Sequence, residues 1–456
     1  MTRGELLAGV DVGTTSVKVL LMAPDGNEVA AGRAPTVWEG GVGGSEADPQ
    51  AFRHSAVQAL TAALEDVPHA RVTAVGVASM AESGVLVDAQ DQPLAKVIAW
   101  HDTRDVADLQ DLIADLGAER FSRITGLPLW TQWSLTKHRW LTRRLPTTRH
   151  AKRRYNIAEW VARGLGAAPV TELSLASRTG WLDLASGTPW HEAMTWSGAS
   201  PSMLGELVSA GQAVGRVPGD HPLGQLRGAT VTIAGHDHQA AVVGAGALGD
   251  NDELDSCGTA EALLRTVNPG LEAEAVGRLA AAGVTVGWHV LPDRWCVLGA
   301  TQGGLILEKV MAGLNVARHS LPQLDQAALQ ATRGASRVEI VPGGHDFVIS
   351  GSTEPADVWR AATESVTEDV RVLSDAISDA TAPRADLVVT GGWGNSEAVL
   401  AAKLRVLGSF RRTTAQEAGA RGAALLAGIA DGTYASYSEL PVAQATRFTA
   451  EQEKLA

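Results

Sequence analysis

The chain has 456 residues, of which 45% are hydrophobic and 20% are charged, as in an ordinary globular protein long enough for two domains. Its formal net charge of −13 argues against a nucleic-acid partner, which would require a basic face. Two cysteines are too few for a disulfide framework, no apolar run is long enough to span a membrane, and Asp11 interrupts the apolar start that a signal peptide would need. We therefore expect a cytoplasmic protein without a membrane or nucleic-acid partner.

The chain begins with two predicted strands, residues 6–12 and 17–22, which are joined by Gly13-Thr14-Thr15-Ser16, the first Gly-Thr turn. Glycine lets the backbone of such a turn approach a phosphate closely, and the N–H groups of a turn can bind an anion. Asp11 lies just before the turn. Its carboxylate is placed to hold a cation near phosphates, or else only to cap a surface hairpin.

Three elements follow: a strand at residues 28–31, a glycine-rich loop at 38–47, and a helix at 49–64 with a proline in its first turn. The next predicted strand, residues 72–78, ends in a loop that contains Glu82. Ligands bind at the carboxyl ends of strands in α/β folds, so Glu82 is a candidate acceptor for substrate hydroxyl groups. An ordinary exposed glutamate is the alternative interpretation.

A predicted strand at residues 95–100 leads into Trp100-His101-Asp102. An indole face packs well on the C–H groups of a sugar, and a carboxylate can accept two hydroxyl hydrogen bonds. The alternative is that Trp100 belongs to the core and that Arg104 pairs with Asp102 on the surface.

Residues 231–234 form a predicted strand that leads into His236-Asp237-His238 and an alanine-rich helix. A carboxylate beside an incoming hydroxyl group can orient that group and accept its proton in phosphoryl transfer. Asp237 is therefore the candidate catalytic base, although aspartate is also among the commonest N-cap residues. The two histidines lack the third protein ligand of a catalytic zinc site. Residues 244–249 fit G-x-G-x-x-G, but they close a helix, whereas a dinucleotide site needs glycines that open one.

The strand–turn–strand pattern recurs around Cys257-Gly258-Thr259-Ala260, the second Gly-Thr turn. Two such turns suggest a duplicated lobe with the phosphate groups of one ligand between the copies. When the turns are aligned on Gly-Thr, Ser256 takes the place of Asp11. Only the first turn therefore carries a carboxylate placed to hold a metal ion.

Two glycine pairs in the second half of the chain lie at the predicted start of a helix or the end of a strand. Gly303-Gly304 opens a helix that carries Glu308, and a predicted strand at 386–390 runs into Gly391-Gly392 and Asn395. A glycine pair between a strand end and a helix suits an adenosine site.

Four motifs occur in order: D-x-G-T-T-S at residues 11–16, Gly-His-Asp at 235–237, S-C-G-T-A at 256–260 and T-G-G-W-G-N-S-E at 390–397. Together they resemble the FGGY carbohydrate kinases of the sugar kinase–actin–Hsp70 superfamily, and the resemblance covers nearly the whole chain. It implies an α/β fold with two actin-like (ribonuclease H-like) lobes and an interlobe cleft. Residues 1–248 would form the sugar-binding lobe with the base, and residues 249–456 the nucleotide-binding lobe.

The resemblance implies ATP-dependent phosphorylation of a hydroxyl group of a neutral sugar or polyol, with Asp237 as the base and Mg²⁺ near Asp11. The implied substrate-binding residues are Glu82, Trp100, His101, Asp102 and His238. The implied nucleotide-binding residues are Gly13, Thr14, Thr15, Lys18, Gly258, Thr259, Gly304, Glu308, Gly391, Gly392 and Asn395. The loop at Glu82 departs from the Gln- or Arg-containing loops that other members of the family have, so the identity of the sugar is not predicted. A homodimer is possible, but the sequence does not decide the oligomeric state.

The main alternative function is a non-catalytic, actin-like ATP-binding regulator or scaffold. Such a protein needs neither Asp237 nor the sugar elements between Trp100 and Asp102. A third interpretation, an NAD-dependent dehydrogenase, depends only on the glycine pattern at residues 244–249.

Overall fold

The computed structural model describes residues 4–41, 44–341, 343–344 and 346–449. The chain divides into two compact units. Unit 1 contains residues 1–244, 268–296 and 417–442, and unit 2 contains residues 245–267, 297–416 and 443–456. The predicted boundary after residue 248 lies near the end of the first segment of unit 1, while two later segments also belong to that unit. The last of them contains helix α14 (Ala418–Asp431), which packs on the first strands of the chain.

Unit 1 is built on a six-stranded sheet. In spatial order its strands are β14 (Gly215–Arg216), β15 (Thr230–His236), β6 (Arg71–Ser79), β1 (Glu5–Val12), β2 (Ser16–Met22) and β3 (Glu28–Pro35). The first predicted strand pair is the antiparallel hairpin β1–β2, in which Asp11 lies opposite Lys18. Strand β6 runs parallel to β1, and β15 runs parallel to β6. The carboxyl ends of these three strands therefore lie at the same edge of the sheet.

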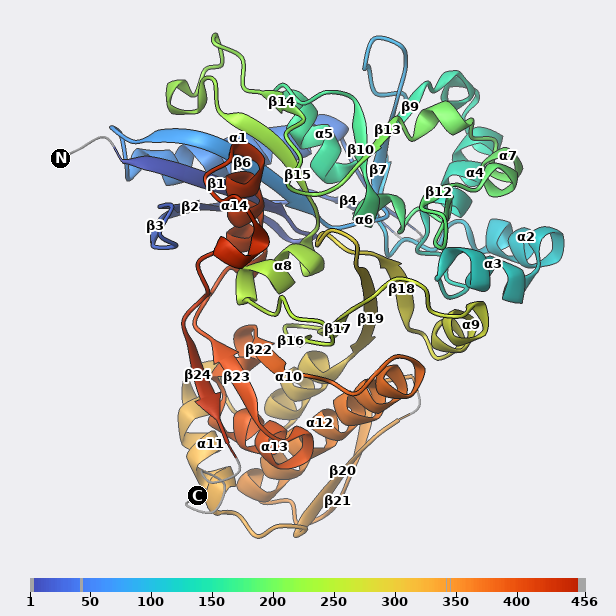
Figure 1. The fold of residues 1–456 in the computed structure, drawn as a ribbon. Coiled ribbons are helices and arrows are strands. Elements are labelled where there is room, and N and C mark those ends of the chain that lie inside the picture. Colours follow the sequence, from blue (N-terminus) through green and yellow to red (C-terminus); the bar gives the residue numbers. More distant parts are fainter. Residues whose placement is uncertain (1–3, 42–43, 342, 345, 450–456) are drawn as a thin grey trace. The chain divides into compact units, whose positions relative to one another are not determined.

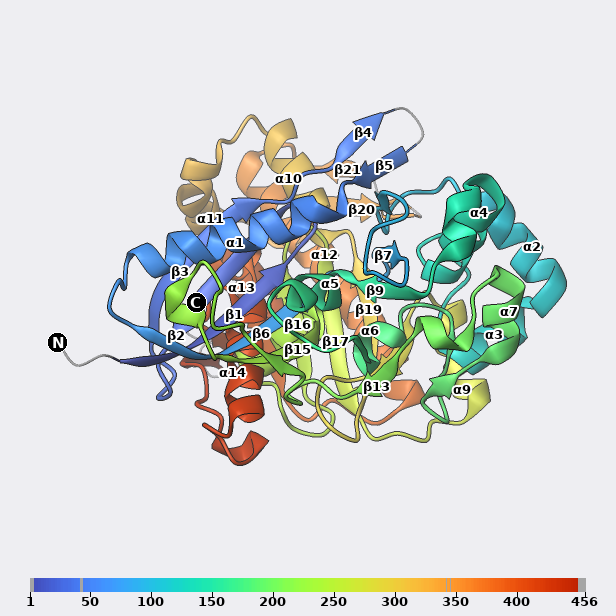
Figure 2. The ribbon, with the colours of Figure 1, turned by 90° about the horizontal axis from the view of Figure 1, so that it is seen from above.

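Helices cover both faces of this sheet. Helices α1 (Pro49–Glu65) and α5 (Ile157–Gly164) pack on one face, and α14 packs on the other, against β1 and β6 (Figures 1 and 2). Asp48 caps α1 by accepting a hydrogen bond from the backbone N–H of Gln50, as expected for the residue before a first-turn proline. The helices approach the strands so closely that only glycine fits at some contacts.

Gly9 is the clearest of these contacts, and it predicts a large stability effect. A Cβ atom at Gly9 would lie 1.8 Å from the backbone oxygen of Ala420 on α14. We expect Gly9→Ala to lower the free energy of unfolding by about 1–3 kcal/mol, because the helix must move away from β1. Thermal or urea unfolding measures this change. Gly224→Ala is the matched control, since a Cβ there meets no atom within 4 Å and should leave stability nearly unchanged.

Shorter elements complete unit 1. Its other strands are β4 (Glu39–Gly41), β5 (Gly44–Ala47), β7 (Gly84–Val87), β8 (Val97–Ile98), β9 (Arg153–Asn156), β10 (Val170–Glu172), β11 (Leu182–Asp183), β12 (Thr188–Pro189), β13 (Glu206–Val208) and β18 (Thr285–Trp288). Its other helices are α2 (Val106–Leu116), α3 (Ala118–Thr125), α4 (Ser134–Arg144), α6 (Leu173–Ala176), α7 (His191–Ser197), α8 (Asp237–Ala245) and α9 (Ala273–Ala281). Buried Trp133, Trp181 and Trp190 belong to a second hydrophobic core, which packs α2, α3, α4 and α7 together.

Unit 2 contains its own sheet, with the strand order β19 (Trp295–Thr301), β17 (Glu261–Val267), β16 (Glu253–Cys257), β22 (Leu387–Thr390), β23 (Phe410–Thr413) and β24 (Ala445–Phe448). The predicted second strand pair is the antiparallel hairpin β16–β17, and β22 runs parallel to β16. Helices α10 (Gly303–Gly313), α11 (Leu321–Gln330), α12 (Pro355–Ala380) and α13 (Glu397–Leu407) pack with one another, and β20 (Ser336–Ile340) pairs with β21 (Phe347–Gly351).

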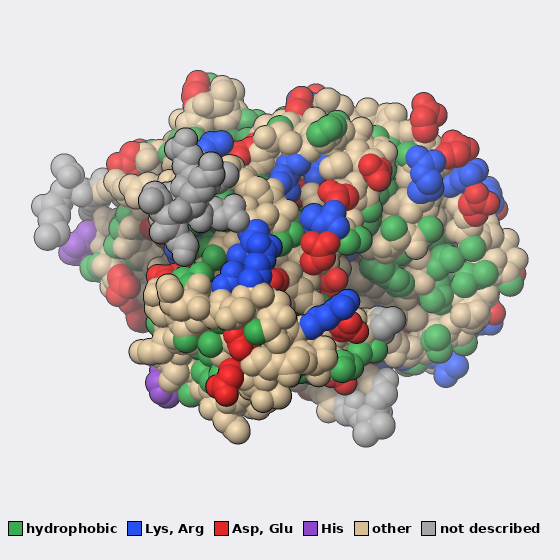
Figure 3. Space-filling model, turned by 90° about the horizontal axis from the view of Figure 1, so that it is seen from below, with side chains coloured by type: hydrophobic (Ala, Val, Ile, Leu, Met, Phe, Trp, Pro, Cys, Tyr) green, Lys and Arg blue, Asp and Glu red, His purple; other side chains and the backbone are tan. Residues whose placement is uncertain are grey.

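Exposed basic side chains often lie beside acidic ones. Arg120 pairs with Glu192 at 2.5 Å and Arg371 pairs with Glu368 at 2.6 Å. On the face drawn in Figure 3, Lys and Arg side chains are likewise interspersed with Asp and Glu side chains.

Within the described residues, none of the helices has both the length and the apolar character needed to cross a bilayer.

Candidate active site

Three of the predicted functional segments of unit 1 meet at one edge of its sheet. Asp11 lies near the carboxyl end of β1, Glu82 follows β6, and Asp237 follows β15. The register aligns these ends, because Ser79 of β6 pairs with Val12 of β1 on one side and with His236 of β15 on the other. The carboxyl edge of a sheet is where α/β folds bind ligands, so the fold collects these residues where a site is expected.

Asp11 is a buried carboxylate with an unused oxygen. Its side chain is enclosed by the start of α14, where a Cβ on Gly419 would lie 2.6 Å from Asp11 Oδ2. Its Oδ1 atom is buried and accepts no hydrogen bond from any described residue. Burial first, and then the nearby charge of Asp237, raise the pKa of Asp11 to about 7. An added positive charge would relieve both effects.

These properties fit the predicted metal ion. Mg²⁺ prefers carboxylate oxygens and is usually held by one or two of them together with substrate phosphates. An orphaned buried oxygen beside a second carboxylate offers that chemistry. Lys18 lies opposite Asp11 on β2. Its ammonium group forms an ion pair at 2.8 Å with Glu417, the residue just before α14, so its positive charge lies toward Glu417.

The first Gly-Thr turn is fixed by side chains from distant segments. The indole N–H of Trp100 donates to Thr14 Oγ1 at 3.0 Å, and that of Trp38 donates to the backbone oxygen of Thr14 at 2.8 Å. Thr36 donates its hydroxyl proton to the backbone oxygen of Gly13 at 2.8 Å. Trp100 is half-buried, so it is neither a simple core residue nor a free surface one. It connects the predicted sugar element to the predicted phosphate turn.

Asp237 opens helix α8, as the sequence predicts, and its side chain is partly exposed. Its Oδ1 atom accepts a hydrogen bond from the backbone N–H of His238 at 2.7 Å and lies 3.3 Å from Nε2 of His236. The other oxygen, Oδ2, accepts no hydrogen bond from a residue that the structure describes. Asp237 therefore uses one oxygen at the start of the helix and keeps the other without a hydrogen-bond partner among the described residues.

The loop before Asp237 has a demanding geometry. Gly235 has a φ of +81°, and a Cβ there would lie 2.5 Å from both Ser174 Oγ and Val290 Cγ1, so only glycine fits. The backbone N–H of His236 donates to Ser174 Oγ at 3.0 Å, and this hydroxyl donates to Glu172 at 2.5 Å. Burial raises the pKa of Glu172 to about 7. This chain of contacts fixes the position at which the Asp237 helix begins.

His236 is neutral in this environment. Burial first, and then the positive charge of Arg178, lower the pKa of His236 well below its usual value. A neutral imidazole next to Asp237 carries no positive charge that could balance the charge of the carboxylate.

Glu82 is buried, which contradicts the alternative of an ordinary exposed glutamate. Its φ of +65° lies in the left-handed region that non-glycine residues rarely adopt, and such strain is common at functional sites. Its Oε1 atom accepts hydrogen bonds from Arg178 at 2.7 Å and from Gln132 at 3.1 Å. Arg178 also donates to Thr285 at 2.7 Å. Neither Arg178 nor Gln132 was predicted from the sequence as a site residue.

Asp102 is also buried and fully engaged. Its Oδ2 accepts from the backbone N–H of Ser45 at 2.7 Å and from Arg104 at 2.8 Å, and its Oδ1 accepts from the backbone and side chain of Arg104. Burial acts to raise the pKa of Asp102, but the hydrogen bonds from Arg104 and Ser45 together lower it. The pair with Arg104 exists as the alternative interpretation expects, although Asp102 lies inside the protein rather than on its surface.

The two predicted histidines are exposed. His101 packs edge-on against Trp100 with ring centroids 5.2 Å apart, and the ring of His238 lies 5.4 Å from that of His236. Among the described residues, the only close set of potential metal ligands is Asp255, Cys257 and Glu261, which contains neither His236 nor His238. The zinc interpretation thus gains no support.

In unit 2, the second Gly-Thr turn packs against the start of α10. A Cβ at Gly304 would lie 2.0 Å from the backbone oxygen of Gly258 and 2.6 Å from that of Thr259. Gly304 is therefore required for this approach. Glu308 lies one turn further along α10 and is exposed.

The glycine pair after β22 lies next to the same turn. Gly391 has a φ of +93°, and a Cβ there would lie 2.6 Å from the backbone oxygen of Cys257, whereas a Cβ at Gly392 would meet open space. Asn395 donates its amide to the backbone oxygen of Gly392 at 3.2 Å and accepts a hydrogen bond from Arg412. Gly304 and Gly391 thus pack against the second Gly-Thr turn, whereas Asn395 is engaged with Gly392 and Arg412.

The G-x-G-x-x-G pattern is not a dinucleotide site. Helix α8 ends at Ala245, and Gly246 follows with a φ of +77°, so these glycines close a helix instead of opening one. Gly244 also packs against α14, where a Cβ would lie 1.9 Å from the backbone oxygen of Ala418.

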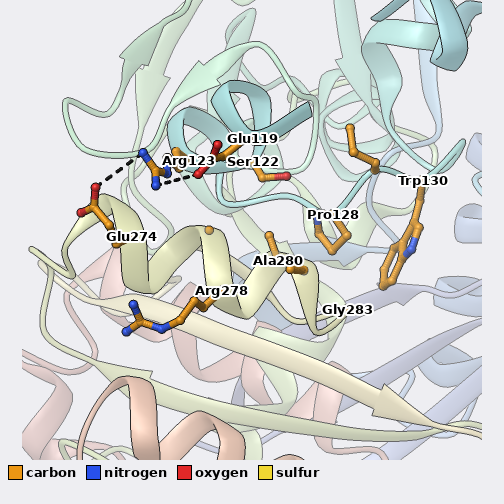
Figure 4. A pocket seen from close by; sticks show the side chains of 12 residues that line it. Glu119, Ser122, Arg123, Pro128, Trp130, Glu274, Arg278, Ala280 and Gly283 are labelled. Carbon is orange, nitrogen blue, oxygen red and sulfur yellow. Dashed lines mark ion pairs between the residues drawn. The ribbon is translucent and has the colours of Figure 1, made fainter. Parts of the chain in front are cut away.

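One cavity of unit 1 lies apart from all predicted site residues. It has a volume of about 670 Å³ and lies between α3 and α9 (Figure 4). Arg123 at its rim pairs with Glu119 at 2.7 Å and with Glu274 at 3.5 Å. Trp130 closes one side and stacks on Trp133 with centroids 5.9 Å apart.

Known proteins match this chain along nearly its whole length. It is 27% identical to the xylulose kinase of Streptomyces coelicolor, covering 93% of this chain and 89% of that protein. It is 26% identical to the glycerol kinase of Renibacterium salmoninarum, and this match covers 96% of this chain and 91% of that protein. The crystal structure of the xylulose kinase from Rhodospirillum rubrum has the same fold, with a TM-score of 0.87 at 22% identity over 99% of this chain and 96% of that one.

Residues 6–244 match the sequence model of the N-terminal domain of the FGGY family of carbohydrate kinases. This match covers more than half of the chain, and it includes the first Gly-Thr turn, the sugar elements and Asp237. The neighbouring structures have two actin-like lobes, which confirms the predicted fold class. The chain therefore belongs to the FGGY family of carbohydrate kinases and is an ATP-dependent carbohydrate kinase.

Proposed function

We propose that the protein transfers the γ-phosphate of ATP to a hydroxyl group of a neutral sugar or polyol, with Asp237 as the general base. The observation that carries this proposal is the common edge of β1, β6 and β15, which brings Asp11, Glu82 and Asp237 together. Asp237 would accept the hydroxyl proton with Oδ2, while the N–H of His238 holds Oδ1. The relatives named above phosphorylate small polyhydroxylated molecules, which agrees with this assignment.

Asp11 is the proposed Mg²⁺-binding residue, through its orphaned Oδ1 atom. When bound, Mg²⁺ would supply charge stabilisation to the phosphates. The first Gly-Thr turn would receive phosphate oxygens on its backbone N–H groups, and the contacts of Trp38 and Trp100 with Thr14 would keep the turn rigid. In unit 2, Gly258 and Thr259 would receive phosphates, and Gly391, Gly392 and Asn395 would contact the adenosine.

The proposed sugar-binding residues are Glu82, Trp100, His101, Asp102 and His238, and the structure suggests different tasks for them. Glu82 and Asp102 are each held by an arginine, so they would present oriented, partly satisfied oxygens instead of free charges. The exposed histidines can donate or accept hydrogen bonds. Gln132 and Arg178, which both contact Glu82, join the proposed set.

The charge balance of this set favours a neutral substrate. Arg104 is engaged by Asp102 and Glu46, and Arg178 is engaged by Glu82, so neither is free to pair with an anionic substrate. A substrate phosphate would face Asp11 and Asp237 as well as the phosphates of ATP. At about 4 Å and an effective dielectric constant of about 20, each like-charge contact costs about 4 kcal/mol.

ADP release across matched pairs of free and phosphorylated sugars and polyols tests both the activity and this preference. We expect sugar-dependent ADP release with the free members and at most a few per cent of that rate with their phosphates, roughly as the charge penalty requires. Turnover confined to the phosphorylated members would contradict the neutral-substrate proposal. ADP release at the same rate without any sugar would favour the alternative of an actin-like regulator.

A further inference from the structure

One buried ion triad joins both ends of the second Gly-Thr turn in unit 2. The Nζ atom of Lys403 on α13 lies 2.5 Å from Asp255 Oδ2 and 2.5 Å from Glu261 Oε1. Asp255 lies on β16 before the turn, and Glu261 begins β17 after it. The exposed fractions of the three side chains are only 1% for Lys403, 0% for Asp255 and 6% for Glu261. We call these three residues the Lys403 triad.

The triad is not a vacant cation site. The ammonium group of Lys403 already contacts both carboxylates, and the adjoining cavity has a volume of only about 10 Å³. Burial by itself would lower the pKa of Lys403, but the carboxylates of Asp255 and Glu261 outweigh this effect and raise the pKa well above its usual value. Lys403 therefore stays charged and satisfies the carboxylates itself.

The triad lies next to the predicted nucleotide elements of unit 2, because Glu261 and Lys403 line the same small cavity as Gly258, Gly304 and Trp393. A Cβ at Gly303 would lie 2.5 Å from Glu261 Oε2, so this carboxylate supports the start of α10. Gly304 packs on the turn itself, and Gly391 packs on Cys257. Lys403 lies on the helix that directly follows the segment from Gly391 to Asn395. The turn and the start of α10 thus share one charged support, and α13 connects this support to the predicted adenosine segment.

We propose that Lys403 is a positioning residue for the nucleotide: its two ion pairs hold residues 257–260 in the conformation that receives phosphates and fix this turn to α13. This inference rests on the proposed nucleotide-binding function of the turn. Without the ammonium group, two buried carboxylates would face each other unpaired, which is strongly unfavourable. The turn would separate from α13 to hydrate them, and nucleotide affinity would fall while the sugar residues of unit 1 stay unchanged.

Lys403→Met tests this role, because methionine keeps the length of the side chain and removes its charge. We expect the Kd for ADP with Mg²⁺, measured by calorimetry, and the KM for ATP to rise by roughly tenfold or more. The KM for the best sugar found in the ADP-release screen should change less than about twofold. Amide hydrogen exchange at residues 256–262 should become faster in the protein without ligands.

Arg265→Met is the matched control. Arg265 forms an equally buried ion pair with Glu253 on the same two strands, at the end of the hairpin opposite to the turn. This variant should lose thermal stability but keep the Kd for ADP of the unchanged protein. If both variants weaken ADP binding equally, the Lys403 triad has only a general stabilising role and the inference is wrong.

Two further variants keep the test decisive if Lys403→Met folds poorly. Glu261→Gln keeps the pair of Lys403 with Asp255, so it should fold and weaken ADP binding less than Lys403→Met. The triple variant Asp255→Asn, Glu261→Gln, Lys403→Met removes all charge from the site, and it should recover part of the lost affinity. Unchanged ADP binding and unchanged exchange at residues 256–262 in Glu261→Gln would contradict the inference.

Hydrogen exchange also separates this inference from the function on which it rests. If ADP slows exchange at Gly258 and Thr259 in the unchanged protein, the turn binds nucleotide. Normal ADP affinity in folded Lys403→Met would then overturn the role of Lys403 alone. If ADP leaves these amides unaffected in the unchanged protein, the proposed function of the turn is wrong, and the positioning role falls with it.

Discussion

Asp237→Asn is expected to lower kcat by about 10²–10⁴-fold, the usual contribution of a general base. The amide has almost the shape of the carboxylate and can still accept the His238 N–H at the start of α8. It cannot accept the proton of the substrate hydroxyl group. Steady-state kinetics with the best sugar of the screen measures the loss, and the Kd for ADP should change less than about twofold because Asp237 is not assigned to the nucleotide.

Asp220→Asn provides the matched control for this variant. Asp220 is an exposed aspartate of unit 1 in a loop before β15, so its amide form should show normal turnover. Turnover near the normal level in Asp237→Asn would remove this residue from the mechanism. An equal fall in ADP affinity and in kcat would show instead that the variant disturbs the nucleotide site.

Local patterns in the sequence were sufficient to predict the two Gly-Thr turns. Each turn lies between two short apolar strands, and such a pair can form a hairpin without help from distant residues. The structure confirms both hairpins, β1–β2 and β16–β17. The helix starts at Pro49 and Asp237 were likewise predictable, because their signals are local.

The prediction of a loop at residues 38–47 was wrong in its described part. Strands β4 and β5 pair with each other there, and β5 pairs with β8 through Glu46 and Ile98; residues 42–43 lie outside the described residues. Glycine-rich sequence argues locally against strands, but a partner strand from a distant segment overrides that tendency. The strand predicted at residues 95–100 is correspondingly short, since β8 contains only Val97 and Ile98.

The contacts that shape the site could not be predicted from local sequence patterns. Glu82 and Arg178 are 96 positions apart in the sequence, and nothing in their spacing indicates that they pair. The same is true of Lys403, which contacts Asp255 and Glu261 on either side of a turn more than a hundred positions earlier. The return of α14 to unit 1 was also missed, although its small residues suit a helix that packs closely on Gly9. A single sequence contains the chemistry of these residues but not their pairing.

Asp11→Ala is expected to have the second large effect, and it tests the inequality of the two Gly-Thr turns. The change removes the buried carboxylate whose Oδ1 atom has no hydrogen-bond partner among the described residues. The Mg²⁺ concentration for half-maximal activity should rise by roughly tenfold or more, and kcat should fall, because the carboxylate proposed to hold Mg²⁺ would be gone. Ser256→Ala, at the equivalent position of the second turn, should change either value by less than about twofold. Titration of activity with Mg²⁺ at saturating ATP measures both variants.

Asp11→Asn adds a control for shape, since its amide fills the same space beside Gly419 without the charge and should behave like alanine in the Mg²⁺ titration. Equal effects of the changes at Asp11 and Ser256 would mean that the two turns bind the metal–nucleotide complex in the same way, and the assignment of Mg²⁺ to Asp11 would then be wrong.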